Sequence, residues 1–114
     1  MSIEINNLTN YKINKKLFRK IIKDILGDKN ISIALVKKEE IKKINKKYKN
    51  KNQSTDVLSF SNDSEDPFYT PEIVICPDQA DNIYQVLIHG LLHVLGYNHK
   101  NMQTKQKYYF KKYE

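Results

Sequence analysis

The chain has 114 residues, of which 39% are hydrophobic, and this composition indicates one globular domain and excludes a disordered polar chain. A single cysteine, Cys76, excludes an internal disulfide framework and a cysteine-rich zinc ribbon, and it suits a reducing cytoplasm. The formal net charge is +7, no apolar run is long enough to span a bilayer, and the first residues lack the pattern of a signal peptide, so we expect a cytoplasmic location.

The first half of the chain predicts alternating strands and helices: a strand at 3–5, a helix at 14–26, a strand at 31–36 and a helix at 39–48. Asn14 is the residue type that caps a helix N-terminus, and Gly27 is the type that ends one. Polar residues follow the second helix, so 49–54 is predicted to be a loop.

The second half predicts two strands and then two helices. The strands are Val57–Phe60 and Glu72–Cys76, with an acidic loop between them. The next helix is predicted to start at Pro77-Asp78 and to carry the histidines, and a short terminal helix is predicted from Thr104 to Tyr113. This order predicts a small α+β single domain over 1–114: a mixed β-sheet of about four strands, helices packed on it, and a metal site at the end of a central helix.

Charge is unevenly spread along the chain. Six of the 13 acidic residues lie between Ser61 and Asp81, where there is no lysine or arginine, so the rest of the chain has 20 bases against seven acids. Such a basic surface attracts polyanions, including nucleic acids. A composition rich in Lys and Asn, with Arg19 as the sole arginine, can equally reflect codon bias, so charge alone leaves nucleic-acid binding open.

All three histidines of the chain fall within one stretch of eleven residues. His89 and His93 are four residues apart, so on a helix they share one face. Gly96 can end that helix in a left-handed conformation, after which the chain can turn back and bring His99 beside the other two. Three imidazoles with one open position are typical of a catalytic zinc site, where the ion lowers the pKa of a bound water.

Two other interpretations of the histidines remain open. A structural zinc site would need a fourth protein ligand, which Cys76, Asp56 or Glu72 could supply. The spacing His-x3-His-x2-Gly-x2-His is also that of metzincin proteases. Those proteases place a glutamate directly after the first histidine as general base, whereas this chain has Gly90, which cannot take a proton.

The stretch Ile88–His99, Ile-His-Gly-Leu-Leu-His-Val-Leu-Gly-Tyr-Asn-His, resembles the signature of the YbeY family, single-domain metal-dependent endoribonucleases tied to ribosomal RNA maturation. Thr55–Phe60 resembles the family's strand preceding the site, and Asn45–Tyr48 and Glu72–Cys76 resemble neighbouring segments. The resemblance therefore covers nearly the whole chain.

The resemblance implies a zinc-dependent endoribonuclease that acts on single-stranded RNA in ribosomal RNA maturation and ribosome quality control. It implies that His89, His93 and His99 bind one Zn²⁺ ion per chain. Lys49 stands where the family usually has an arginine, so it is the candidate for contacting substrate phosphate. Lysine keeps the positive charge but lacks the planar guanidinium that binds two phosphate oxygens at once. Asp56 is the candidate for orienting a ligand or a water, with helix capping or solvation at the strand edge as the alternative.

The partner implied is RNA, either ribosomal RNA or the small ribosomal subunit, with neither DNA nor a membrane expected. The family's Tyr-Asp-His is Tyr97-Asn98-His99 here, so Asn98 removes a charge beside a ligand, and we expect weaker tuning of that ligand. Lys49 and Asn98 also favour an alternative function, a non-catalytic zinc-stabilised module that binds the ribosome or RNA.

Overall fold

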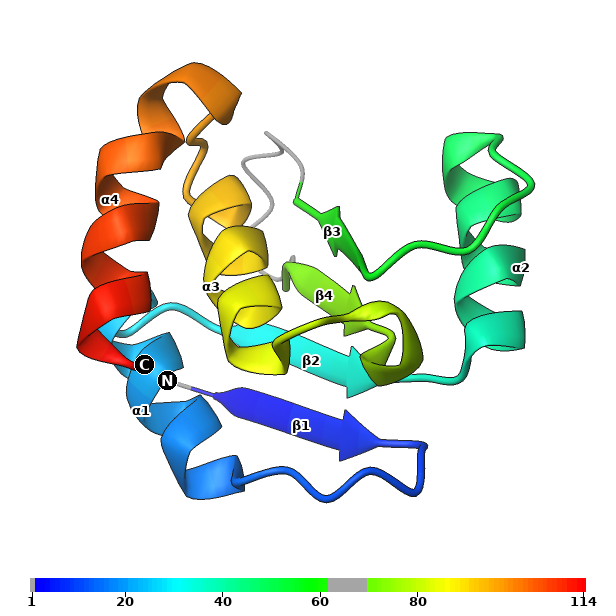
Figure 1. The fold of residues 1–114 in the computed structure, drawn as a ribbon, viewed down its shortest axis with the longest axis horizontal. Coiled ribbons are helices and arrows are strands. Elements are labelled where there is room, and N and C mark those ends of the chain that lie inside the picture. The colour runs from blue at the N-terminus through cyan, green and yellow to red at the C-terminus, as the bar shows by residue number, and fades with distance from the viewer. Residues whose placement is uncertain (1, 62–69) are drawn as a thin grey trace.

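The computed structural model describes residues 2–61 and 70–114, and within these the helices and strands alternate before ending in two helices (Figure 1). The elements in chain order are β1 (Ile3–Asn7), α1 (Lys15–Leu26), β2 (Ile31–Leu35), α2 (Lys38–Lys49), β3 (Val57–Phe60), β4 (Glu72–Ile75), a 3₁₀ turn (Pro77–Gln79), α3 (Ile83–Val94) and α4 (His99–Lys112). The predicted order of elements is therefore confirmed, and the predicted acidic loop lies largely outside the described residues, at 62–69.

The strands form one mixed sheet in the order β1-β2-β4-β3. β1, β2 and β4 run parallel, with Ile5 opposite Ile33 and Ile33 opposite Ile73, while β3 pairs antiparallel with β4. Parallel neighbours need a crossover connection, and α1 is the helix that joins β1 to β2. The mixed four-stranded sheet agrees with the α+β fold predicted from the sequence.

The two faces of the sheet carry two separate apolar clusters because successive strand residues point to opposite sides. Ile33 and Ile73 belong to the larger cluster, which contains the buried residues of α1, α3 and α4. Val74 and Cys76 belong to the smaller one, with Ile41 of α2. In Figure 1, α3 accordingly lies between α4 and the sheet, while α2 stands apart at the other end.

The ends of α1 follow from its flanking residues. The Asn14 side chain accepts a hydrogen bond from the Leu17 N–H at 3.0 Å, which satisfies one of the free N–H groups of the first turn. Gly27, at φ 66°, ends the helix and donates its N–H to the Lys23 carbonyl. Both predicted boundary residues are confirmed.

The predicted starts of the last two helices are wrong. Pro77–Gln79 forms only a 3₁₀ turn, and α3 begins at Ile83, where the Asn82 side chain accepts hydrogen bonds from two backbone N–H groups. Proline suits the first turn of either kind of helix, so it could not distinguish the two. The terminal helix starts at His99 rather than Thr104, because Asn98 caps it in a reciprocal pair with Asn101. No helix among the described residues is long and apolar enough to cross a membrane.

Candidate metal centre

His89 and His93 lie on the half-buried side of α3, whose other side is packed into the larger cluster. Leu87 and Leu91 are fully buried there, and burying a leucine side chain contributes roughly 1.5–3 kcal/mol, so the helix position is firmly set. The two imidazole rings meet edge to face with centroids 4.6 Å apart, and their Nε2 atoms are 3.1 Å apart. The predicted shared face is confirmed.

Gly96 turns the chain back after α3. The Gly96 N–H donates to the His93 carbonyl at 2.9 Å and the Tyr97 N–H donates to the Leu92 carbonyl at 3.1 Å, which is the Schellman arrangement of hydrogen bonds. This arrangement requires a positive φ at the residue after the helix, and Gly96 has φ 96°. The turn leads into α4, whose first residue is His99.

The three histidines converge, as the sequence predicted. His99 has its ring centroid 5.3 Å from that of His93 and 6.0 Å from that of His89. One ring nitrogen of each residue lies within 4.8 Å of the other two. A tetrahedral zinc ion with Zn–N bonds of about 2.0–2.1 Å holds its nitrogens about 3.3–3.4 Å apart, so these side chains could hold such an ion after small shifts of the rings.

Among the residues that the structure describes, the cluster contains three histidines. Among the described residues, no carboxylate or thiolate joins it, so Asp56, Glu72 and Cys76 do not supply the fourth ligand that a structural zinc site would need. Cys76 is fully buried in the cluster on the α2 side of the sheet, and burial raises the pKa of its thiol. An arrangement of three imidazoles leaves one position of a tetrahedral ion for a water or a substrate oxygen.

The surroundings of His93 favour its neutral, metal-binding form. Burial, together with the nearby His89 and His99, lowers the pKa of His93, although a hydrogen bond with the Tyr97 backbone opposes this effect. His89 Nδ1 is 2.7 Å from Oε1 of Gln106 on α4. Sequence reasoning missed Gln106; its signal is a spacing of seven residues from His99, which places both on one face of a helix that starts at His99.

Lys49 and Asp56 lie in the same cavity as the three histidines. This cavity of about 510 Å³ is also lined by residues of β3 and its two flanks, which are Thr55, Val57, Leu58, Ser59 and Ser61. Lys49 ends α2, and its Nζ lies 5.2 Å from the centroid of the Phe60 ring. Asp56 precedes β3 and also lines an adjoining cavity of about 280 Å³ with His89 and Gln106. The geometry brings all five sequence-predicted residues together, and the roles of Lys49 and Asp56 stay predictions.

A buried asparagine holds the segment that carries Lys49. Asn45 is 3% exposed, and its Nδ2 donates to the Gln53 carbonyl at 2.9 Å across the loop that follows α2. Its own carbonyl accepts from the Lys51 N–H at 3.2 Å. These two bonds tie the first part of the loop to α2.

Gly90 is a packing residue. A Cβ atom at this position would lie 3.1 Å from Cγ2 of Ile73 and 3.3 Å from Oγ of Ser59, so α3 can approach the sheet closely only because no side chain is present. The Cβ of a glutamate at this position would crowd Ile73 and Ser59 of the sheet. The structure thus argues against the protease interpretation more strongly than the missing carboxylate alone.

Asn98 caps α4, and its expected effect on the neighbouring ligand stays a prediction. Its side chain accepts hydrogen bonds from the N–H groups of Lys100 and Asn101 at the start of α4. Asparagine and aspartate are about equally good N-caps. Asn98, in place of the aspartate of the family's Tyr-Asp-His, therefore preserves this cap and with it the position of His99.

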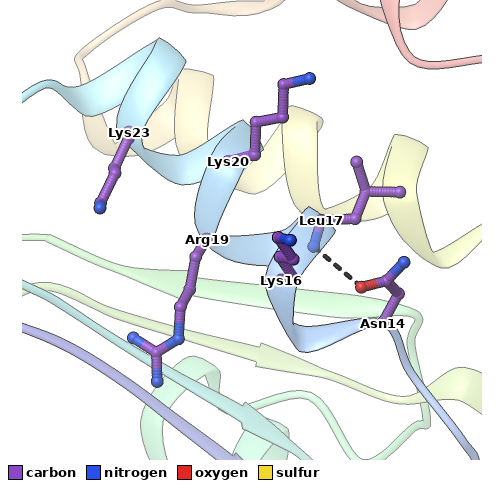
Figure 2. A pocket seen from close by; sticks show the side chains of 6 residues that line it. All are labelled: Asn14, Lys16, Leu17, Arg19, Lys20 and Lys23. Atoms are coloured by element: carbon purple, nitrogen blue, oxygen red, sulfur yellow. Dashed lines mark hydrogen bonds between the residues drawn. The ribbon is translucent and has the colours of Figure 1, made fainter.

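A further cavity of about 560 Å³ lies along α1 and has a cationic lining (Figure 2). In Figure 2, Arg19 and Lys23 extend to one side of the helix and Lys20 to the other. The lining contains no histidine, acid or cysteine, so it offers neither metal ligands nor a general base. The histidine cavity, unlike the cavity along α1, contains candidate metal ligands and a carboxylate.

Comparison with known proteins agrees with this geometry. Residues 3–114 match the family model described as "Endoribonuclease YbeY". Proteins of that name from Thermosipho melanesiensis and Nautilia profundicola are 36% and 34% identical, over 92% and 96% of this chain and 91% and 90% of theirs. The solution structure of a Thermotoga maritima protein superposes with a TM-score of 0.61 at 30% identity, over 94% of this chain and 85% of that one.

Proposed function

The chain belongs to the YbeY family of endoribonucleases, and we propose that it hydrolyses phosphodiester bonds of single-stranded RNA with the help of one bound zinc ion. The observation that carries this proposal is the convergence of three imidazoles and one lysine on a single cavity. The imidazoles are the ligands of a metal with an open position, and the lysine is a cation suited to a phosphate.

His89, His93 and His99 would hold the ion. When bound, the ion supplies a Lewis acid that polarises a phosphoryl oxygen and lowers the pKa of water toward neutrality. The lowered pKa of His93 favours the neutral form that a metal ligand requires. The packing of α3 keeps two of the rings in place before any substrate arrives.

Lys49 would bind the substrate phosphate beside the histidines. Its side chain is exposed, and among the described residues its ammonium makes no ion pair, so it is available to an anion. Asp56, an acceptor on the same cavity wall, would orient a water or an RNA hydroxyl. The exposed lysines of α2 would extend the cationic surface along the RNA, and they are Lys42, Lys43, Lys46 and Lys47.

The RNA processed is proposed to be ribosomal. Maturation and quality control of ribosomal RNA, in the cytoplasm and in contact with the small ribosomal subunit, is the role that the family resemblance implies. The basic surface and the single cysteine support that setting.

Cleavage of labelled single-stranded RNA by the zinc-loaded chain tests the proposal. His93→Ala should abolish cleavage and stoichiometric zinc binding. Lys49→Ala should lower cleavage about 10- to 100-fold at unchanged zinc content, since a hydrogen bond to a charged group contributes about 1.5–3 kcal/mol. Lys49→Arg should preserve or raise cleavage by gripping two phosphate oxygens.

Lys20→Ala, on the cationic cavity of α1, is the matched control and should leave cleavage unchanged. RNA affinity should also fall with salt, by about 0.7 log units per log of salt for each phosphate contacted. If the zinc-loaded chain binds RNA and leaves it intact, the catalytic proposal is wrong and the non-catalytic binding module takes its place.

A further inference from the structure

Gln106 reaches the histidine cluster from the middle of α4. Its Oε1 lies 2.7 Å from Nδ1 of His89, and both side chains are half-buried. α4 begins at His99, and seven residues are close to two helical turns, so the same face of α4 presents His99 and then Gln106. One helix thereby contributes a candidate ligand and holds the ring of another candidate ligand on α3.

The hydrogen bond decides which nitrogen of His89 is free. A neutral imidazole carries one N–H, and the amide oxygen of glutamine can only accept, so the proton resides on Nδ1. The lone pair is then on Nε2, which lies 3.1 Å from Nε2 of His93. Without a partner, the neutral histidine side chain in water prefers its proton on Nε2, where it would block metal binding through that nitrogen.

We propose that Gln106 is a positioning residue of the metal centre. It holds His89 in the Nδ1–H tautomer and fixes the rotation of the ring, so that Nε2 faces the other two histidines. This inference rests on the proposed function only in requiring a metal at the histidines, and RNA cleavage is no part of it. Asn98 cannot take this role, because its side-chain oxygen caps α4.

The test compares three substitutions on the same helix. Gln106→Leu removes the acceptor at similar volume, Gln106→Glu restores an acceptor, and Gln103→Leu alters an exposed position one turn earlier as the matched control. Zinc affinity is measured by competition with a chelator. Nitrogen–proton correlation spectra of the histidine rings report the tautomer of His89 in the metal-free chain.

Gln106→Leu should lower zinc affinity about 10- to 100-fold, the usual effect of losing a group that orients a ligand. It should also move His89 toward the Nε2–H tautomer. Gln106→Glu should bind zinc at least as tightly as the wild type, and Gln103→Leu should match the wild type. Should Gln106→Leu fail to fold, Gln106→Asn, which keeps the amide but shortens the side chain, should show the same loss of affinity.

Wild-type zinc affinity in a folded Gln106→Leu chain, or a His89 that keeps its proton on Nδ1 there, would overturn the proposal. These results differ from a failure of the proposed function. A chain whose zinc affinity depends on Gln106 but which leaves RNA intact would refute the nuclease and uphold the positioning role. A chain that cleaves RNA and binds zinc independently of Gln106 would do the reverse.

Discussion

Replacing Gly96 by alanine should weaken the metal centre without touching a ligand. Gly96 has φ 96°, and no atom lies within 4 Å of where its Cβ would be, so the cost of alanine is confined to the backbone. Holding a non-glycine residue at such a φ costs about 1–3 kcal/mol. For a domain of this size, that cost lowers the melting temperature by roughly 4–12 °C.

The loss in zinc affinity follows from the same strain. If the metal-free variant relaxes its turn, His99 leaves the cluster, and binding zinc must restore the strained turn. The affinity then falls by the part of the strain that the metal-free chain relieves, at most about 150-fold for 3 kcal/mol, and only the remaining part lowers the melting temperature of the metal-free chain. Thermal unfolding of the metal-free chain and chelator competition measure the two quantities separately.

Gly27→Ala supplies the control. Gly27 also has a positive φ, 66°, also follows a helix, and also has open space at its Cβ, but it closes α1. Its substitution should cost comparable stability and leave zinc affinity within about two-fold, because α1 holds no ligand. If Gly96→Ala loses stability as expected and binds zinc like Gly27→Ala, the turn does not place His99 and the reasoning fails.

Two further predictions concern the rest of the chain. Hydrogen bonds from Lys112 and Tyr113 lower the pKa of Asp24, while burial and the bond to Asp24 raise the pKa of Tyr113 to about 12. This cluster should therefore stabilise the fold between about pH 4 and 10 and lose that contribution as pH falls below 3.8 or rises toward 12. Asp24→Asn should flatten both ends of a profile of melting temperature against pH, and a wild-type profile in this variant would contradict the assignment. Gly90→Glu should destabilise the chain by more than about 4 kcal/mol in denaturant unfolding, through a buried carboxylate against Ile73, and should give no peptide hydrolysis; a folded variant that cleaves casein would revive the protease interpretation.

The sequence predicted the parts of the site that local rules govern. The spacing of His89 and His93 and the glycine at 96 each imply one backbone geometry, and the structure has that geometry. The start of α4 was missed because Asn98 was interpreted by its chemistry toward a ligand rather than as a cap. That error concealed Gln106, since only a helix that begins at His99 places the two residues on one face.

Other features depend on tertiary packing that no local pattern encodes. Gly90 packs against Ile73 and Ser59, which lie on two different strands. The sequence does not show this packing, and there Gly90 indicates only that the general base of a metzincin protease is missing. The hydrogen bond from Asn45 to Gln53 crosses a loop whose path the sequence leaves open. We expected Lys49 to lie near the histidines because of the family resemblance and because an RNA substrate needs a cation beside the metal. The charge of the chain alone does not indicate where such a cation lies.

α4 is bonded to α1 at its C-terminal end and buries little of its surface. Its first residue is His99, and at its other end Lys112 and Tyr113 each contact Asp24 of α1 at 2.7 Å. Met102 is its one fully buried side chain. A helix held in this way is suited to detach as one cooperative unit while the sheet and α3 stay folded.

Such a partial opening would dismantle the metal centre, because His99 and Gln106 leave together. A metal ion held by the three histidines would bind only the closed form, so by mass action it would raise the free energy of this opening. Exchange of the amides in the core strands would still depend on global unfolding alone. The rate of hydrogen exchange at the α4 amides would then report the fraction of the protein that holds a metal ion. The last helix of the chain would thus also set how quickly the ion is released.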